Sequence, residues 1–152
     1  MIQEIMFKGK RADNGEWVYG RPFKINESDR HFISPIGSNI YNSSDNEQFI
    51  IKFHGMFISI EAIEVVPKTV GQFTGLTDNN GIKIYEGDIL ATEKRDVMFI
   101  IIWDRFSCGF KFKDNFDGCL LNIDLKALRK IEVIGNVHDN PELLENGDNN
   151  ES

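Results

Sequence analysis

Short runs of alternating apolar and polar residues make up most of this chain, and turn-forming residues separate them. The first such region, residues 5–23, alternates around the tetrad Ala12, Asp13, Asn14 and Gly15. An Asn-Gly pair supplies the positive φ angles that tight hairpin turns require. We therefore predict that MFKGKR and EWVYGRPF pair as an N-terminal β-hairpin.

The next region is less regular. In residues 31–41, short apolar pieces are broken by Pro35 and Gly37, and residues 42–47 form a polar stretch. Proline and glycine interrupt regular strands. The sequence predicts a variable excursion here, with the most irregular and mobile backbone of the chain.

Two further strand-like runs, FIIKF and MFISI, are separated by His54 and Gly55. The second run continues into EAIEVV, where the mixture of isoleucine, valine and glutamate favours a bent strand over a helix. Pro67 is expected to end it.

The stretch TVGQFTGLTDNNGIKIYEGDIL, residues 69–90, sets glycines and Asx residues at intervals among strand-forming residues. Residues 78–81 predict a tight turn with Gly81 in a left-handed conformation, and residues 86–88 predict a second turn. Gly71 and Gly75 bracket Phe73, which is expected to be buried. We interpret this stretch as a folding signature that bends the backbone and carries no catalytic chemistry.

Three more strands are predicted at residues 97–103, 109–113 and 119–125. A helical turn over residues 124–130, a strand EVIGNVH and a short final helix beginning at Asn140 follow. Regular short strands with such turns are typical of a small barrel or sandwich. The expected fold is mainly β with short helices, with a small SH3-like barrel in the C-terminal half.

Composition fits a folded, water-soluble protein, with 41% hydrophobic and 27% charged residues. The longest apolar run, residues 97–103, falls well short of the roughly 20 residues of a membrane helix, and the N-terminus lacks the apolar core of an export signal. Cys108 and Cys119 flank a predicted turn and could meet across a hairpin. Without an export signal we expect them to be reduced thiols in the cytoplasm.

The net charge of −7 is unevenly distributed. From Ile131 onward there are six acidic residues and no Lys or Arg, which leaves the remaining chain near −1. Tight nonspecific DNA binding requires several phosphates to be neutralised by Lys and Arg. Direct nucleic-acid binding is therefore not favoured.

Several residues could carry chemistry, and each has a simpler explanation. Asp78, Glu86, Asp88 and Asp104 could hold a divalent cation as in metal-dependent nucleases, but their spacing matches no ligand motif and turn chemistry explains them. The remaining candidates are His31, His54 and His138, which are scattered singly through the chain. We predict no catalytic, cofactor-binding or metal-binding residues.

Aromatic and basic residues interleave between residues 105 and 116. Phe106, Phe110, Phe112 and Phe116 with Arg105, Lys111 and Lys113 are similar to strands that stack nucleic-acid bases. Strand alternation instead puts Phe110 and Phe112 on one face and the lysines on the other. We therefore expect the phenylalanines in the core and the lysines in water.

The sequence resembles the YopX family of bacteriophage and prophage proteins. TVGQFTGLTDNNGIKIYEGDI and EVIGNVHDNPELL carry the resemblance, and FKGKR followed by NGEWVYG is similar too. The resemblance is essentially absent at residues 28–60 and beyond 146. It implies a phage-derived protein in the cytoplasm of a bacterial host, forming homo-oligomers, without established biochemical activity or catalytic residues.

From these observations we expect an N-terminal hairpin and variable region at 1–68, a YopX-like β-barrel core at 69–146 and a disordered tail at 147–152. The expected function is that of a non-enzymatic, homo-oligomeric protein-interaction module that needs no cofactor. Its other partner would be an unknown phage or host protein. The alternative from another class is a nucleic-acid-associated protein or a metal-dependent nuclease.

Overall fold

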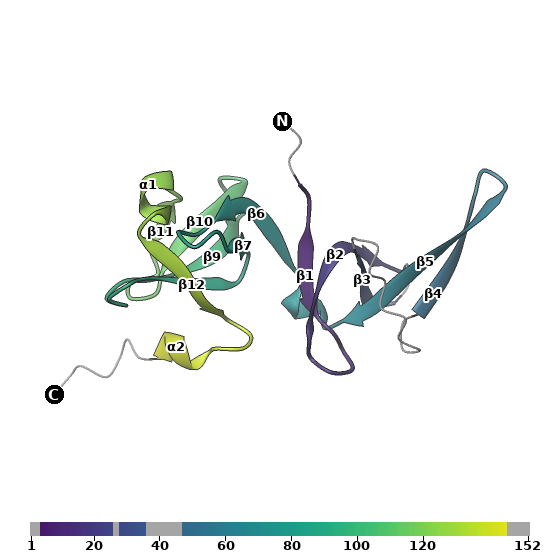
Figure 1. Ribbon diagram of the computed structural model, residues 1–152, viewed down its shortest axis with the longest axis horizontal. Coiled ribbons are helices and arrows are strands. Elements are labelled where there is room, and N and C mark those ends of the chain that lie inside the picture. Colours follow the sequence, from purple (N-terminus) through teal and green to yellow (C-terminus); the bar gives the residue numbers. More distant parts are fainter. Residues whose placement is uncertain (1–3, 26–27, 36–46, 146–152) are drawn as a thin grey trace. The chain divides into compact units, whose positions relative to one another are not determined.

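A computed structural model describes residues 4–25, 28–35 and 47–145, with backbone alone for 47–53 and 57–60. The described elements are antiparallel strands in two sheets and a few short helices (Figure 1). This confirms the mainly β prediction. The chain divides into two compact units, Met1–Gln72 and Phe73–Ser152, where the sequence suggested a boundary near Pro67. The described residues contain no helix with the length and hydrophobicity of a membrane span.

The first unit is built on one antiparallel sheet with strand order β4-β5-β3-β2-β1, followed by the start of β6. Its elements are β1 (Phe7–Lys10), β2 (Trp17–Lys24), β3 (His31–Pro35), β4 (Glu47–Phe53), β5 (Met56–Val65), the 3-10 turn η1 (Pro67–Thr69) and the first residues of β6 (Gly71–Thr77). Phe32, Ile33, Ala62, Ile63 and Val65 form its buried apolar interior.

The predicted N-terminal hairpin is confirmed. β1 and β2 pair from Phe7 opposite Gly20 to Lys10 opposite Trp17. The intervening loop closes by hydrogen bonds from the Arg11 amide to the Glu16 carbonyl and from the Gly15 amide to the Arg11 carbonyl. Gly15 takes a φ of 74°, so a glycine relieves the strain of this left-handed position.

The second hairpin of the first unit has a tighter turn. His54 and Gly55 both have positive φ, 47° and 80°, and join Phe53 directly to Met56. Positive φ at both central residues defines the primed turn that suits the twist of paired strands. The predicted runs on either side are β4 and β5, and the predicted continuation as a strand to Val65 is also confirmed.

β3 occupies part of the region that was expected to be irregular. It pairs with β2 on one side and β5 on the other, which stabilises a strand that Pro35 would otherwise discourage. Tertiary pairing therefore overrides local propensity here. The rest of the predicted excursion, residues 36–46, lies outside the described residues.

The second unit contains a five-stranded antiparallel sheet of order β11-β10-β9-β8-β12. Its strands are β8 (Asp88–Thr92), β9 (Met98–Asp104), β10 (Gly109–Asp114), β11 (Leu120–Asn122) and β12 (Ile131–Asn136), and β7 (Lys83–Tyr85) pairs with the second part of β6. β11 and β12 end this order as edge strands. The expected barrel closure is therefore not found among the described residues.

Two short helices match the predicted positions. α1 (Leu125–Leu128) begins at Asp124, whose carboxylate accepts a hydrogen bond from the Lys126 amide. α2 (Glu142–Glu145) follows Pro141, but Asn140 Oδ1 lies 3.3 Å from the Asn136 amide rather than capping the helix. Gly135 makes room for this arrangement, because a Cβ there would lie 2.4 Å from Asn140 Oδ1.

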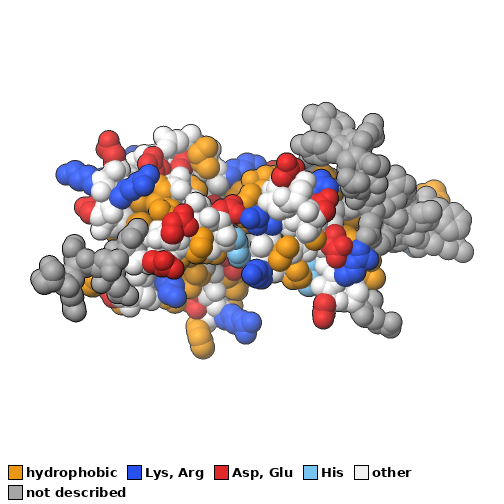
Figure 2. Space-filling model, turned by 90° about the horizontal axis from the view of Figure 1, so that it is seen from below, with side chains coloured by type: hydrophobic (Ala, Val, Ile, Leu, Met, Phe, Trp, Pro, Cys, Tyr) orange, Lys and Arg blue, Asp and Glu red, His pale blue; other side chains and the backbone are white. Residues whose placement is uncertain are grey.

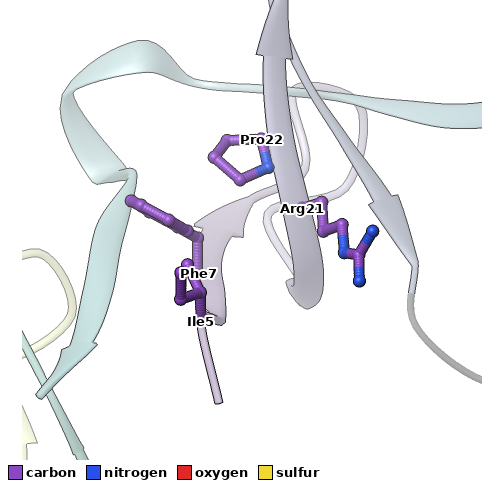
Figure 3. Close-up of a pocket in the computed structure, with 4 residues that line it drawn as sticks. All are labelled: Ile5, Phe7, Arg21 and Pro22. Carbon is purple, nitrogen blue, oxygen red and sulfur yellow. The ribbon is translucent and has the colours of Figure 1, made fainter. Parts of the chain in front are cut away.

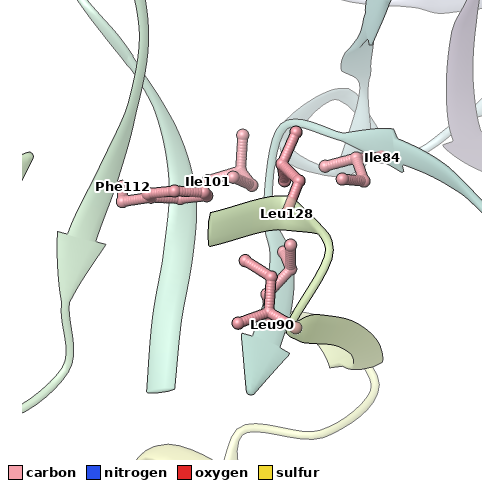
Figure 4. Close-up of a cluster of buried hydrophobic side chains, with 6 residues drawn as sticks. Ile84, Leu90, Ile101, Phe112 and Leu128 are labelled. Carbon is pink, nitrogen blue, oxygen red and sulfur yellow. The ribbon is translucent and has the colours of Figure 1, made fainter. Parts of the chain in front are cut away.

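The core of the second unit lies between the sheet and α1. Ile84, Leu90, Ile101, Phe112, Leu128 and Ile131 form one buried cluster, which Figure 4 shows with Leu128 reaching from α1 toward the strands. Burying an aliphatic or aromatic side chain of this size contributes about 1.5–3 kcal/mol each. This cluster fixes β9 and β10, whose hairpin loops reach solvent.

The two stretches that carried the family resemblance contact each other in this unit. The Val133 amide donates to Asp78 Oδ2 at 2.9 Å, and the Asn79 amide donates to the Ile131 carbonyl at 3.3 Å. The Val137 amide donates to the Gly87 carbonyl at 2.9 Å. Both signature turns are thus bound to β12 or to the residues that follow it.

Candidate interaction surface

The hairpin loops at the two ends of β10 have the same construction. Each follows an aspartate, Asp104 or Asp114, whose carboxylate accepts hydrogen bonds from loop amides. Asp104 accepts from Phe106 and Ser107 at 3.2 Å each, and Asp114 accepts from Phe116 at 2.7 Å. We call residues 105–108 and 115–118 the Asp-x-Phe loops.

The last residue of each Asp-x-Phe loop is left-handed. Cys108 has a φ of 51° and Gly118 a φ of 73°, which corresponds to Gly15 in the first hairpin. A left-handed residue at this point returns the chain into the next strand. The carboxylate and this residue together hold each loop in a defined shape.

Both loops present a phenylalanine to solvent. Phe106 is 101% exposed and Phe116 is 88% exposed, and they lie at opposite ends of β10. A large exposed aromatic side chain keeps almost all of its apolar area in water, so a partner that covers it gains that area. The prediction that these phenylalanines lie in the core is wrong for Phe106 and Phe116, because both fall in loops beyond the ends of the strand.

The strand itself follows the predicted alternation. Phe112 is buried and stacks on Phe99 with ring centroids 5.0 Å apart, whereas Lys113 is exposed. Lys111 donates to the Asn122 side chain on the neighbouring strand. Core phenylalanine and solvated lysine on opposite faces are therefore confirmed for β10.

β11 is an edge strand with all of its side chains exposed. Leu120 is 47% and Leu121 is 44% exposed, and Asn122 is exposed as well. In the described part of the chain, β11 pairs with β10 alone, so one side of its backbone faces away from the sheet. Natural proteins usually cover or charge such edges, because unpaired strand amides and carbonyls attract another strand.

Two further exposed apolar side chains lie close to these loops in sequence. Trp103, at the end of β9, contacts Phe110 edge to face at 5.0 Å and remains 44% exposed, and Leu125 at the start of α1 is 64% exposed. We use the name hairpin surface for six exposed residues of this hairpin region, which lie at both ends of β10 and on both faces of the sheet. They are Trp103, Phe106, Phe116, Leu120, Leu121 and Leu125.

The carboxylates of Asp78 and Asp88 accept hydrogen bonds from backbone amides. Asp78 is 6% exposed, and its Oδ1 accepts from the amides of Asn80 at 2.8 Å and Ile82 at 2.9 Å. Asp88 is 2% exposed and accepts from the Tyr85 amide at 2.8 Å. The interpretation of Asp78 as a turn residue and of Asp88 as a strand entry is confirmed.

The other acidic candidates lie elsewhere. Glu86 lies in the turn before β8, and Asp104 ends β9. The Ser107 hydroxyl, which donates to Asp104 Oδ2 at 2.6 Å, lowers the pKa of that carboxyl below its ordinary value. Among the described residues, no three His, Cys, Asp or Glu side chains come together as metal ligands.

The histidines are placed separately. His31 lies on β3 with Nδ1 3.0 Å from the Asp29 carbonyl, His54 lies in the β4–β5 turn, and His138 follows β12, where its amide donates to Asn136. The structure does not bring them to one site within either unit.

Cys108 and Cys119 are free and exposed. Cys108 ends the first Asp-x-Phe loop and Cys119 follows the second, so that β10 lies between them and the expectation that they flank a single turn is wrong. The neighbouring Asp117 carboxylate raises the pKa of the Cys119 thiol.

The first unit has a shallow hollow of about 470 Å³ lined by Ile5, Phe7, Arg21 and Pro22. Figure 3 shows Pro22 on the same side of β2 as Phe7, whereas the Arg21 guanidinium points away from Ile5 and Phe7. The walls of the hollow are therefore mainly apolar, and the side chains that line it bring no polar groups together. It lacks the arrangement of a specific small-molecule site.

On the face seen in Figure 2, the charged side chains that the structure describes do not gather into a patch of one sign. Lys and Arg side chains alternate there with Asp and Glu over the described residues, and apolar groups lie between them. The exposed apolar groups are more concentrated in sequence, since six of the eleven exposed large hydrophobic residues of the described chain belong to the hairpin surface.

Sequence reasoning missed the hairpin surface. The signal was present, because Asp-x-Phe occurs at 104–106 and again at 114–116. Counting phenylalanines as core residues obscured it. Exposure of β11 depends on strand order, which the sequence does not show.

The fold and this surface describe a class of protein: two compact β units that display apolar side chains on hairpins. A sequence model described as YopX protein matches residues 6–145, and the chain belongs to the YopX family. The crystal structure of protein EF1440 from Enterococcus faecalis is similar, with a TM-score of 0.61 and 21% identity over 94% of this chain and 99% of that one. That likeness shows a shared fold. No curated protein matches the sequence.

Proposed function

We propose that this chain is a non-enzymatic, homo-oligomeric protein-interaction module encoded by a phage or prophage and working in the cytoplasm of its bacterial host. The hairpin surface is the observation that carries this proposal. Exposed aromatic and aliphatic side chains on ordered backbone are typical of sites where another protein binds.

Rigidity of the Asp-x-Phe loops supports the same function. Asp104 and Asp114 hold the loop amides, so Phe106 and Phe116 are presented on ordered backbone. Binding then requires little further loop ordering, which lowers the entropic cost of association. Aromatic side chains in such positions often contribute most of the binding energy of an interface.

The roles of the buried carboxylates also support a non-enzymatic protein. Asp78 and Asp88 use their oxygens to bind backbone amides of Ile82, Val133 and Tyr85. Replacing those contacts by a substrate or cation would leave buried amides unsatisfied, at about 1–3 kcal/mol each.

Light scattering after size exclusion tests self-association. The wild-type chain at micromolar concentration should give a mass above 17.4 kDa, and a variant with Phe106→Ser and Phe116→Ser should move toward 17.4 kDa. Ile82→Ser is the matched control, because Ile82 is 53% exposed but lies outside the hairpin surface. A monomeric wild-type chain would overturn the proposal.

A gel shift distinguishes the proposed interaction module from a nucleic-acid-associated protein or a metal-dependent nuclease. Single-stranded and duplex DNA are mixed with the protein at low salt, with and without magnesium, because phosphate contacts are strongest at low ionic strength. We expect neither a shift nor cleavage. A salt-sensitive shift or magnesium-dependent cleavage would replace the proposed function by the alternative.

A further inference from the structure

We propose that β11 is the strand through which two copies of this chain pair, antiparallel, about a two-fold axis at Leu121. This inference rests on the proposed self-association and names the part of the hairpin surface that lies at its two-fold axis. It extends the sheet of one copy into the sheet of the other.

The hydrogen bonding of β11 determines which of its groups are available. The Asp114 amide donates to the Cys119 carbonyl at 2.9 Å, and Phe112 lies opposite Leu121 in the register. Hydrogen-bonded pairs alternate along antiparallel strands. Leu121 therefore bonds toward β10, whereas the amides and carbonyls of Leu120 and Asn122 point away from the sheet.

These outward groups are self-complementary. If the axis passes beside Leu121, Leu120 of one copy lies opposite Asn122 of the other, and each such pair exchanges both of its N–H···O bonds. Leu121 then faces Leu121 of the second copy in a non-hydrogen-bonded pair, where Cα atoms lie about 4.5 Å apart. No other register centred within β11 pairs all of its outward groups.

The side chains agree with this register. Leu121 continues the row of Ile101 and Phe112 on the core face, so two exposed leucines cover each other at the axis. On the other face, Lys113 lies beside Leu120 and Lys111 beside Asn122. The lysines of the two copies are separated by both β11 strands, about 14 Å at 4.8 Å per strand, which exceeds the screening length of about 8 Å.

A second copy fits this edge better than an unrelated strand for two reasons. The hydrogen bonds and the leucine contact are both satisfied by the same residues under two-fold symmetry, which is the usual symmetry of dimers. The edge is also short, so a long partner strand would find few additional groups to pair.

A symmetric cysteine tests the register. In a Cys108→Ser, Cys119→Ser background, Leu121→Cys places two thiols across the axis at a separation that a disulfide spans. With oxidised glutathione as the electron acceptor, the two thiols should form one disulfide, and a linked dimer should appear on a non-reducing gel. Ile82→Cys in the same background is the control, because Ile82 is exposed but lies outside both β11 and the hairpin surface.

A proline tests the hydrogen bonds. Leu120→Pro removes an amide that points away from β10, so the β10–β11 pairing is retained while the intermolecular bond is lost. We expect its dimer dissociation constant to rise at least about tenfold, which corresponds to 1.4 kcal/mol, with an unchanged far-UV circular dichroism spectrum.

The outcomes separate the two proposals. An oligomeric wild-type mass with no Leu121→Cys cross-link and no effect of Leu120→Pro would overturn the β11 interface and leave self-association standing. A monomeric wild-type mass would overturn both. A monomer that binds a strand of another protein, and loses it in Leu120→Pro, would also overturn the second-copy proposal.

Discussion

Asp78 and Asp104 both begin turns of the second unit, and both accept hydrogen bonds from the amides of those turns. Asp78 is buried and also binds β12, whereas Asp104 binds only its own loop among the contacts described above. The same chemistry therefore has opposite consequences. One turn holds the fold together, and the other presents Phe106 to solvent.

This comparison teaches that turn chemistry has to be judged together with the surroundings of each turn. Buried turn residues should affect stability and leave association unchanged. Residues of the Asp-x-Phe loops should affect association and leave stability nearly unchanged. The following experiments test that division.

The largest expected difference in the free energy of unfolding is between alanine variants of two phenylalanines four residues apart. Phe112→Ala removes a ring that is 2% exposed, and should lower the free energy of unfolding by about 3–5 kcal/mol. Phe116→Ala removes a ring that is 88% exposed, and should change it by less than about 0.5 kcal/mol. Urea unfolding followed by tryptophan fluorescence measures both, and similar losses would contradict the division.

Asp78→Ala should produce the next largest effect. It leaves the amides of Asn80, Ile82 and Val133 without their acceptor, at about 1 kcal/mol or more each, so we expect a loss of about 3 kcal/mol. Asp78→Asn keeps one acceptor oxygen and should lose less. Asp104→Ala is the matched exposed change, and its urea midpoint should stay close to that of the wild type. A large loss for Asp104→Ala would show that its loop is structural as well.

Gly81→Val and Gly87→Val should each lower stability by about 1 kcal/mol or more. Their φ angles are 78° and 88°, which a β-branched residue resists. A Cβ at Gly81 would meet nothing within 4 Å, and at Gly87 the nearest atom is 3.6 Å away, so backbone strain is the cause rather than crowding. Thermal melts of both variants measure it. Unchanged midpoints would show that these turns relax without cost.

The sequence predicted the turns of this fold better than it predicted what faces solvent. Gly81, Gly87 and Asp78 were identified because turn conformation depends on local residues, and local chemistry is readable from a single chain. Phe116 was misplaced because it falls in a loop beyond the end of β10. The exposure of β11 was missed because it depends on strand order, which brings together residues far apart in sequence. The strand β3 was missed for the same reason, since its neighbours β2 and β5 stabilise it.

The smallest effect concerns a third aspartate turn, in the first unit, and it depends on pH. The Arg11 guanidinium binds Asp13 at 2.6 Å and lowers the pKa of that carboxyl from 3.8 to about 2. A carboxyl with a lowered pKa stabilises the fold above its ordinary pKa, and this contribution is lost as the pH falls from about 4 toward 2. In a double-mutant cycle of Arg11→Gln and Asp13→Asn, the coupling between the two residues should be present at pH 6 and largely absent at pH 2. Because Asp13 is exposed to solvent, the coupling should also weaken in high salt. A coupling that persists at pH 2 would mean that a hydrogen bond to the neutral carboxyl holds this turn. Asp13 would then resemble Asp78, whose hydrogen bonds with backbone amides stabilise the fold.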